Sequence, residues 1–298
     1  ANNYQFTYVD GTLTVGQRAL TITASNQATT YGTALTLGTS SFTTSGLTNS
    51  DAVSSVTLQQ GGNTTVPATQ GAGTYSSATS NGIVASSASG TGLSNYSITY
   101  VDGTLTINKA TLTVTADNKS KTYGDANPTL TYTFSGFKNG ENEVTAAIAG
   151  APGLSTTALT GSSVGSYTIT SAANNLSADN YQFTYANGSM TVNRRAITVT
   201  ADDGTTRGLY STDTLTGSLA TTATASTSVG TVAITQGTVT NANNSNYDIT
   251  YVPATLTINK ARIAVTGTKV YDGEIEILGS ELAAQGVLGQ TFTVSGSA

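Results

Sequence analysis

The chain has 298 residues, a net charge of −5 and only 9% charged residues. This thinly spread, mildly acidic charge shows no basic patch, which argues against nucleic acid as a partner. The sequence has no Cys and no His, so it can form no disulfide and no Ser-His or Cys-His nucleophile pair. It also lacks an apolar run of about 18 residues, so we expect no membrane insertion in this segment.

One motif recurs four times along the chain. Each copy opens on an Asn-Tyr pair, continues as an alternating, strand-like run, and reaches a short turn followed by a second run such as TLTIN. The four pairs are Asn3-Tyr4, Asn95-Tyr96, Asn180-Tyr181 and Asn246-Tyr247. Internal similarity at a long spacing predicts a tandem array of small modules rather than one large domain.

In chain order, the first expected element is a β-hairpin at residues 1–17. Apolar residues alternate on both sides of Asp10-Gly11, a pattern typical of two strands joined by a tight turn. We interpret this segment as the C-terminal hairpin of a preceding module. The same hairpin is expected around Asp102-Gly103 and Asn187-Gly188, whereas Pro253-Ala254 implies a different turn in the fourth copy.

The second run of each copy leads almost directly into the next strand, which places the module boundaries. We expect module 1 at residues 18–108, module 2 at 109–193, a shortened module 3 at 194–259, and the truncated start of a further module at 260–298. The junctions Asn108-Lys109, Asn193-Arg194 and Asn259-Lys260 contain no Gly/Ser spacer. Stiffly coupled modules would form an elongated rod.

Alternating runs such as TLTVT predict a mostly β protein, with turns at Gly, Asn and Ser. Only residues 141–148 have a composition that favours a helix, and the stretch is short.

The repeated residues resemble a known family. The combination NYxhTYxxGTLTVN, with h apolar, followed by (K/R)AxLTVTA and then by Tyr31-Gly32 or Tyr123-Gly124, resembles the MBG and YDG repeats of large secreted bacterial adhesins of the filamentous-haemagglutinin type. The letters KVYDGEIE at residues 269–276 resemble the opening of a YDG variant. The resemblance implies small, mostly β modules with a β-grasp-like fold and a role in a stalk. Module 3 departs from it, because Arg207-Gly208 stands where Tyr-Gly is expected and its middle is short.

The acidic residues are the candidates for catalysis and for metal binding. The paired carboxylates do not recur between repeats and fall in expected turns or exposed strands, so we predict no enzyme and no cofactor. These pairs are Asp202-Asp203, Glu141 with Glu143, and Glu274 with Glu276. Asp117 and Asp125 could supply oxygen ligands to calcium, but no calcium-loop motif is present, so no metal site is predicted. Asp10 and Asp102 are better explained by turns.

The tyrosines are spaced regularly, in pairs four residues apart on one strand, so that each pair faces one side. They form either the small module core or an exposed ladder that contacts a glycan or protein partner, and repetition in every module favours the core. The candidate contact residues are Tyr4, Tyr8, Tyr96, Tyr100, Tyr181, Tyr185, Tyr247 and Tyr251. Thr-rich faces are interpreted as the solvent side of half-buried sheets rather than as ice-binding surfaces. No motif singles out Lys109 or Lys121 for an isopeptide bond.

The function predicted from the sequence is a structural stalk segment of a secreted bacterial surface adhesin or extracellular matrix fibre. Its partners would be other modules of the same long chain. The alternative is an adhesive module that binds exopolysaccharide or other copies of the fibre through exposed Tyr or strand edges.

Overall fold

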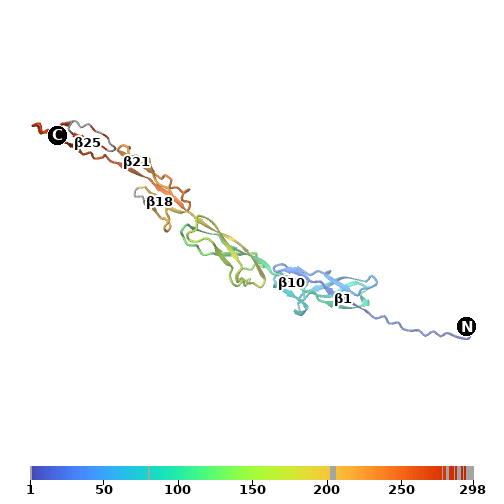
Figure 1. Ribbon diagram of the computed structural model, residues 1–298. Helices are drawn as coiled ribbons and strands as arrows, with labels where there is room; N and C mark the ends of the chain where they lie inside the picture. The colour runs from blue at the N-terminus through green and yellow to red at the C-terminus, as the bar shows by residue number, and fades with distance from the viewer. Residues whose placement is uncertain are drawn as a thin grey trace. The chain divides into compact units, whose positions relative to one another are not determined.

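The computed structural model describes residues 2–79, 81–201 and 206–276, and, further on, residues 278–279, 282–284, 286, 290 and 292 (Figure 1). The chain forms two compact units. The first comprises residues 1–120, 128–158 and 166–191, and the second comprises residues 121–127, 159–165 and 192–298. Module 2 therefore contributes residues to both units.

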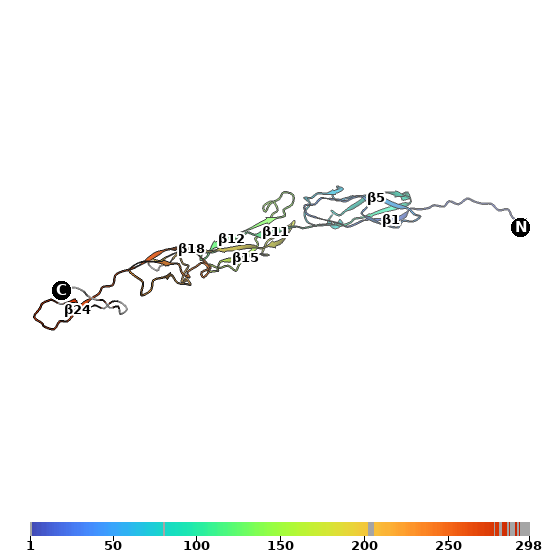
Figure 2. The same cartoon turned by 90° about the horizontal axis from the view of Figure 1, so that it is seen from above.

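Module 1 consists of short strands and two 3-10 turns. Its elements are β1 (Arg18–Ala24), β2 (Gln27–Thr30), β3 (Leu35–Thr36), β4 (Phe42–Ser45), β5 (Ala52–Gln59), β6 (Thr65–Val66), β7 (Gly73–Tyr75), η1 (Ser77–Thr79), β8 (Val84–Thr91), η2 (Leu93–Asn95), β9 (Tyr96–Val101) and β10 (Leu105–Asn108). They form sheets of order β4-β1-β9 and β2-β10-β7, with the pairs β3-β6 and β5-β8 beside them. Figure 2 places β1 and β5 within this module.

The two strands of each repeated motif do not pair with one another. β9 pairs in parallel with β1, and β10 pairs in parallel with β2, so the motif crosses from one sheet to the other at Asp102-Gly103. The hairpin prediction is therefore wrong. The Gly serves close approach instead of a tight turn, because a methyl group on Gly103 would lie 2.7 Å from the Ala24 carbonyl oxygen.

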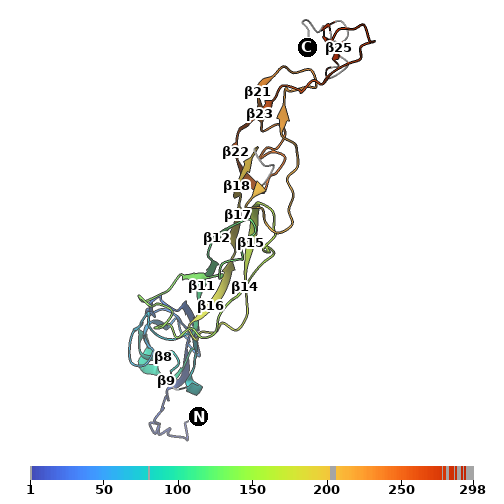
Figure 3. The same cartoon turned by 90° about the vertical axis from the view of Figure 1, so that its left-hand side faces the viewer.

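Module 2 repeats this plan. Its strands are β11 (Ala110–Ala116), β12 (Lys119–Thr122), β13 (Tyr132–Ser135), β14 (Gly153–Thr156), β15 (Gly165–Ala172), β16 (Tyr181–Ala186) and β17 (Gly188–Asn193). β11 lies between β13 and its parallel partner β16, as β1 lies between β4 and β9. Figure 3 shows β11 next to β16. A methyl group on Gly188 would lie 2.4 Å from the Ala116 carbonyl oxygen, which is the same crossing point.

Module 3 keeps the first sheet and loses part of the second. Its strands are β18 (Arg195–Thr200), β19 (Thr206–Arg207), β20 (Ala220–Thr221), β21 (Gly230–Thr235), β22 (Tyr247–Val252) and β23 (Ala254–Ile258). The sheets have the order β19-β18-β22 and β20-β21-β23. No strand among the described residues of module 3 takes the place of β2 or β12.

The register corrects the alignment of Arg207-Gly208. Arg207 pairs with Thr198, as Ser45 pairs with Thr21 and Ser135 with Thr113. Arg207-Gly208 therefore takes the place of Ser-Gly after β4 and β13, and not that of Tyr-Gly. The chain has residues 25–41 between β1 and β4 but only residues 201–205 between β18 and β19, so the segment that carries Tyr-Gly is missing.

The two ends of the described chain carry little regular structure. No strand is assigned at residues 4–17, where Tyr4 and Tyr8 are 76% and 89% exposed, so the predicted terminal hairpin is not formed. The later part contains β24 (Val265–Gly267) and β25 (Leu282–Ala284), which pair antiparallel. The acidic pair Asp202-Asp203 lies outside the described residues.

The expected helix at residues 141–148 is a short series of turns. The Asn142 side-chain oxygen accepts the amides of Val144 and Thr145 at 3.0 Å, and Ala147 has a φ of 51°, which ends the turn. The described residues contain no α-helix, and accordingly no helix of a length and apolarity that would span a membrane. The prediction of mostly β modules in tandem is confirmed, while the β-grasp arrangement stays a prediction.

The cores are small and built from strand residues that point inward at every second position. In the first unit one buried cluster contains Leu20, Ile22 and Ile107 from module 1, and it continues through Leu112 and Tyr181 of module 2. A second cluster in module 2 is formed by Ala116, Ala158, Ile169 and Met190. Apolar packing is thus continuous from module 1 into the beginning of module 2.

Candidate functional site: the tyrosine junctions

Tyr31 lies where module 1 meets module 2. It directly follows β2, and its backbone N–H donates to the carbonyl oxygen of Asn108, the last residue of β10, at 2.9 Å. Gly32 follows with a φ of +89°, and its Cα lies so close to Lys138 that a methyl group would clash with that side chain at 2.5 Å. The Tyr-Gly pair thus turns the chain against the next module.

In module 2, the carboxylate of Glu141 binds the Tyr31 hydroxyl. The Tyr31 hydroxyl donates to Glu141 Oε1 at 2.5 Å, and the Tyr181 hydroxyl donates to Glu141 Oε2 at 2.5 Å. The Tyr181 hydroxyl in turn accepts the Lys138 amide at 2.9 Å. The two rings meet edge to face, with centroids 5.5 Å apart and an interplanar angle of 82°. One carboxylate therefore holds a tyrosine from each module; we call these three side chains the first tyrosine junction.

The same arrangement recurs between modules 2 and 3, inside the second unit. Tyr123 of module 2 donates to Asp213 Oδ2 at 2.8 Å, and Tyr247 of module 3 donates to the same oxygen at 2.5 Å. The Tyr210 amide donates to the Tyr247 hydroxyl at 3.1 Å. The Tyr123 and Tyr247 rings lie 5.6 Å apart at 82°. Tyr123, Asp213 and Tyr247 form the second tyrosine junction.

The asparagine of each Asn-Tyr pair supplies a further contact. Asn180 Oδ1 accepts the Ala72 amide of module 1 at 2.8 Å, and Asn246 Oδ1 accepts the Val164 amide of module 2 at 2.9 Å. The recurring Asn-Tyr pair is therefore a device for binding the preceding module. A basic residue adds to the second junction, where Arg195 donates to the Tyr123 carbonyl oxygen and to Asp125 Oδ1, both at 3.2 Å.

Burial and the neighbouring carboxylates keep the junction tyrosines protonated. Burial, and then the hydrogen bond to Glu141, raise the pKa of Tyr181 to about 12. Burial and the hydrogen bond to Asp213 raise the pKa of Tyr247 to about 12 as well. The same two causes raise the pKa of Tyr31 and of Tyr123. A neutral hydroxyl can donate to a carboxylate, whereas a phenolate would repel it.

The structure divides the candidate tyrosines into three groups. Tyr96, Tyr181 and Tyr247 are 1–5% exposed. Tyr100, Tyr185 and Tyr251 are half-buried, and the hydroxyls of Tyr100 and Tyr251 contact the Ala88 amide and the Ile234 carbonyl. Tyr4 and Tyr8 are exposed. The junctions use Tyr181 and Tyr247 of the first group together with Tyr31 and Tyr123, which were not candidates as contact residues.

The acidic members of the junctions were missed by sequence reasoning, although a signal for them exists. SGLTNSD at residues 45–51, SGFKNGE at 135–141 and RGLYSTD at 207–213 share a Gly, an apolar residue and a terminal acid at equal spacing. Each ends in a tight turn, in which the acid's amide donates to the carbonyl three residues earlier at 2.9–3.0 Å. We call residues 48–51, 138–141 and 210–213 the acidic turns.

The lysines considered for an isopeptide bond and the aspartates considered for calcium all form hydrogen bonds or an ion pair with neighbouring groups. Lys121 is buried, which lowers its pKa, and its ammonium group donates to the carbonyl oxygens of Leu159 and Asp125. Lys109 donates to the Ala178 carbonyl oxygen at 2.8 Å. Asp125 pairs with Arg195, and Asp117 accepts the Thr131 hydroxyl. Across the described residues, no group of three or more acidic side chains is placed to hold a metal ion.

Comparison with known proteins adds a family. The family model described as MBG domain (YGX type) matches residues 20–106, 112–191 and 196–257, and each matched range lies inside one of the three modules defined above. Neither the curated proteins nor the solved structures contain a match. MBG repeats are a non-enzymatic type of domain, typical of extracellular surface proteins. With three tandem matches over most of its length, this chain belongs to the MBG domain family of the YGX type and is a repeat region of the adhesin-like, surface-protein kind.

Proposed function

We propose that the chain is a stalk segment of a secreted bacterial surface adhesin or extracellular matrix fibre, which projects a binding region and bears load. The observation that carries the proposal is the tyrosine junction, in which one carboxylate binds a tyrosine from each of two successive modules. Its recurrence between modules 2 and 3 supports a general rule for joining repeats. The absence of a flexible spacer at the junctions supports the same interpretation.

The strand topology also supports a load-bearing role. Tension would enter module 1 at Arg18, the start of β1, and leave at Asn108, the end of β10. β1 is held to β9 by six parallel register pairs, from Arg18 with Tyr96 to Thr23 with Val101. In such a parallel pair, the ladder bonds lie across the direction of pull and share the load, instead of opening one after another. The same six-residue parallel pairing joins β11 with β16 and β18 with β22.

The alternative, an adhesive module that uses exposed Tyr, has less support. The tyrosines that follow Asn in the three modules are nearly inaccessible, at 1–5% exposed. A sugar ring needs an open aromatic face for stacking. Polysaccharide binding or self-association through Tyr4, Tyr8 or strand edges would be a property added to the stalk.

Small-angle scattering and stretching of single molecules would test the proposal. A rod of three modules has an expected maximum dimension on the order of 100 Å, and this dimension should not change when a chelator is added. Stretching from both ends should give separate unfolding events, one for each module. Unfolding of module 1, residues 18–108, should release on the order of 300 Å of chain at ~3.4 Å per residue. A compact particle, or a chain that extends without force peaks, would overturn the stalk.

A further inference from the structure

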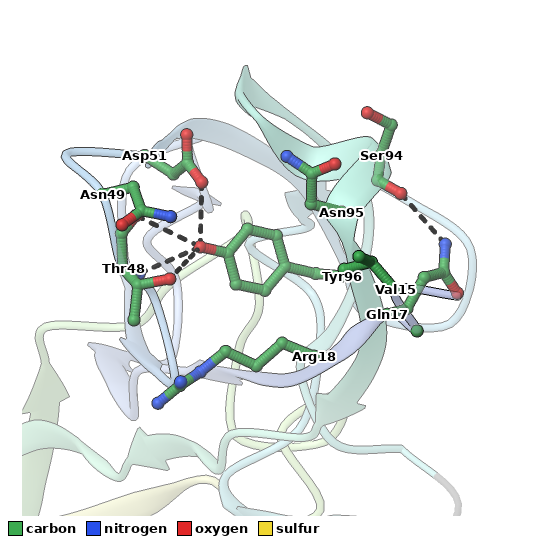
Figure 4. A pocket seen from close by; sticks show the side chains of 10 residues that line it. Val15, Gln17, Arg18, Thr48, Asn49, Asp51, Ser94, Asn95 and Tyr96 are labelled. Carbon is green, nitrogen blue, oxygen red and sulfur yellow. Dashed lines mark hydrogen bonds between the residues drawn. The ribbon is translucent and has the colours of Figure 1, made fainter. Parts of the chain in front are cut away.

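An open pocket lies at the beginning of module 1, where the preceding tyrosine junction would be. It has a volume of about 470 Å³, and residues from the N-terminal segment, the acidic turn and the Asn-Tyr pair line it. Figure 4 shows the Tyr96 hydroxyl directed at Asp51 and Thr48, with Arg18 and Asn95 beside it.

The groups in this pocket match those that the later module contributes to each of the two tyrosine junctions, namely its acidic turn and its Asn-Tyr pair. We call these groups the receiving half of a junction, and we call the two junctions, which also hold a tyrosine of the preceding module, filled. The Tyr96 hydroxyl accepts the Thr48 amide at 2.9 Å and donates to Asp51 Oδ2 at 2.9 Å. Tyr181 makes the same two contacts with the Lys138 amide and Glu141, and Tyr247 makes them with the Tyr210 amide and Asp213. In each filled junction the carboxylate also takes a hydroxyl from the preceding module.

Asn95 supports the comparison from the other side of the pocket. Its counterparts Asn180 and Asn246 are half-buried, and each accepts a backbone amide of the preceding module. Asn95 is exposed. The pocket therefore holds a half-buried acid, a buried tyrosine and an asparagine in the places that these groups take when a Tyr-Gly turn is bound.

The N-terminal segment places a turn of this kind next to the pocket. The letters TLTVG at residues 12–16 correspond to TLTIN at 104–108, and Tyr31 binds through its amide to the carbonyl of Asn108 at 2.9 Å. Gly16 corresponds to Asn108 and lines the pocket. A Tyr-Gly turn bound to the carbonyl of Gly16 would point its ring at Asp51.

Arg18 indicates which turn fits best. It corresponds in register to Arg195, since Arg18 pairs with Tyr96 and Arg195 pairs with Tyr247. Both arginines donate through Nε to a glycine carbonyl at 2.9 Å, Gly46 and Gly208 respectively. Arg195 also donates through Nη1 to the Tyr123 carbonyl and to the Asp125 carboxylate. Arg18 is thus suited to a turn whose third residue is acidic.

We propose that this pocket is the receptor for a Tyr-Gly-Asp turn of another MBG module, located directly upstream in the same chain. The tyrosine hydroxyl binds the Asp51 carboxylate beside Tyr96, as Tyr123 and Tyr247 both bind Asp213 Oδ2. Asn95 accepts a backbone amide, and Arg18 pairs with the aspartate. The inference goes beyond the stalk proposal, because it assigns a binding surface and its ligand whether or not the chain bears load.

The test is a chain in which a copy of residues 109–193 replaces residues 1–16, so that Gln17 takes the place of Arg194 and an added Tyr123-Gly124-Asp125 precedes module 1. Hydrogen exchange of the Thr48 amide is the readout, and the Lys138 amide of the original module 2 in the same molecule shows that the chain is folded. We expect Thr48 protection to rise at least tenfold over the 298-residue chain and to fall back when the added Tyr123 is changed to Phe. Asp51→Asn should remove the gain, and it should abolish the effect of the Tyr→Phe change.

Three results would overturn the proposal. The first is unchanged Thr48 protection in the extended chain while Lys138 stays protected. The second is a Tyr→Phe effect in the added copy that has the same size with the native Asp51 and with the Asp51→Asn substitution. The third is concentration-dependent protection of Thr48 in the original chain, with dimers in sedimentation, because the occupant would then be a turn of a second copy. A compact scattering profile would refute the stalk and leave this inference standing.

Discussion

The first tyrosine junction is expected to couple its three side chains energetically, and the substitutions Tyr31→Phe and Glu141→Gln test this. Tyr31 is 4% exposed and its hydroxyl donates to Glu141 at 2.5 Å. Phe preserves the ring and its edge-to-face contact with Tyr181, so it removes the hydrogen bond alone. Gln preserves the shape of Glu141 but presents only one acceptor oxygen to two tyrosine hydroxyls.

The magnitude follows from the charge and exposure of the acceptor. A hydrogen bond to a charged group contributes about 1.5–3 kcal/mol. Glu141 is half-buried, so solvent screening favours the lower end, and we expect Tyr31→Phe to cost about 1–2 kcal/mol of local opening free energy. The double variant should cost less than the sum of the single variants, with a coupling of about 1 kcal/mol, because both changes remove the same bond.

Native-state hydrogen exchange is the appropriate assay, because unfolding of a multi-module chain need not be two-state. The Lys138 amide, which donates to Tyr181, and the Ala72 amide, which donates to Asn180, report on the junction directly. A loss of about 1.4 kcal/mol lowers their protection about tenfold. The matched control is Tyr100→Phe, whose hydroxyl bonds within module 1 to the Ala88 amide at 2.9 Å; it should leave Lys138 unchanged.

Strict additivity would refute the reasoning. If Tyr31→Phe lowers the protection of Lys138 equally with Glu141 and with its Gln variant, then the tyrosine does not act through the carboxylate. The junction would then be held by ring packing and backbone contacts, and the recurrence of the acid would need another explanation.

Three further predictions concern pH, the strand crossing and load. Burial and the carboxylates raise the pKa of Tyr181 and Tyr247 from 10.0 to about 12, so the folded state favours the protonated hydroxyls. The stability of the junctions should therefore stay constant up to pH ~10 and be lost as the pH rises towards 12. Tyrosinate absorbance should show a late phase that is reduced when Tyr181 and Tyr247 are changed to Phe, the remainder coming from Tyr31 and Tyr123. Gly188→Ala should cost about 1–3 kcal/mol in thermal unfolding, whereas Gly11→Ala, where a methyl group meets nothing within 4 Å, should cost nothing; equal effects would contradict the crossing. Thr21 lies in β1, the central strand of its sheet, which is hydrogen-bonded on both sides. Because proline has no backbone N–H to donate, Thr21→Pro should remove one force peak in single-molecule stretching. The control Thr12→Pro should remove none.

The mostly β character and the tandem plan could be predicted from the sequence, because strand alternation and long-range repetition are local and countable. The partners of the strands could not. TYVDGTLTIN contains the residues of a tight hairpin, but the parallel ladders of β9 with β1 and of β10 with β2 compete with that hairpin. The burial of Leu105 and Ile107 at 0% and 3% exposed shows that the second sheet prevails.

The candidate site could be predicted only in part, because its residues come from two successive modules. The Asn-Tyr pairs and the Tyr-Gly pairs were recognised as repeated letters, but they belong to different modules when they meet. Tyr31 and Tyr181 are far apart in the sequence and contact the same carboxylate. When the repeat is considered one module at a time, each tyrosine is assigned to the core of its own module. An acid such as Glu141 is overlooked, because its only sequence signal is the turn motif shared by residues 45–51, 135–141 and 207–213.

The junctions also give each module a direction. A module donates through the Tyr-Gly turn after its second strand, and it receives through the acidic turn and the Asn-Tyr pair. Modules 1 and 2 carry both halves. Module 3 keeps the receiving half, with Asp213 and Tyr247, but only residues 201–205 separate β18 from β19, which is too short for the strand and turn that end in Tyr31 or Tyr123. The shortening of module 3 therefore removes the strand and the Tyr-Gly turn by which modules 1 and 2 bind the module that follows them.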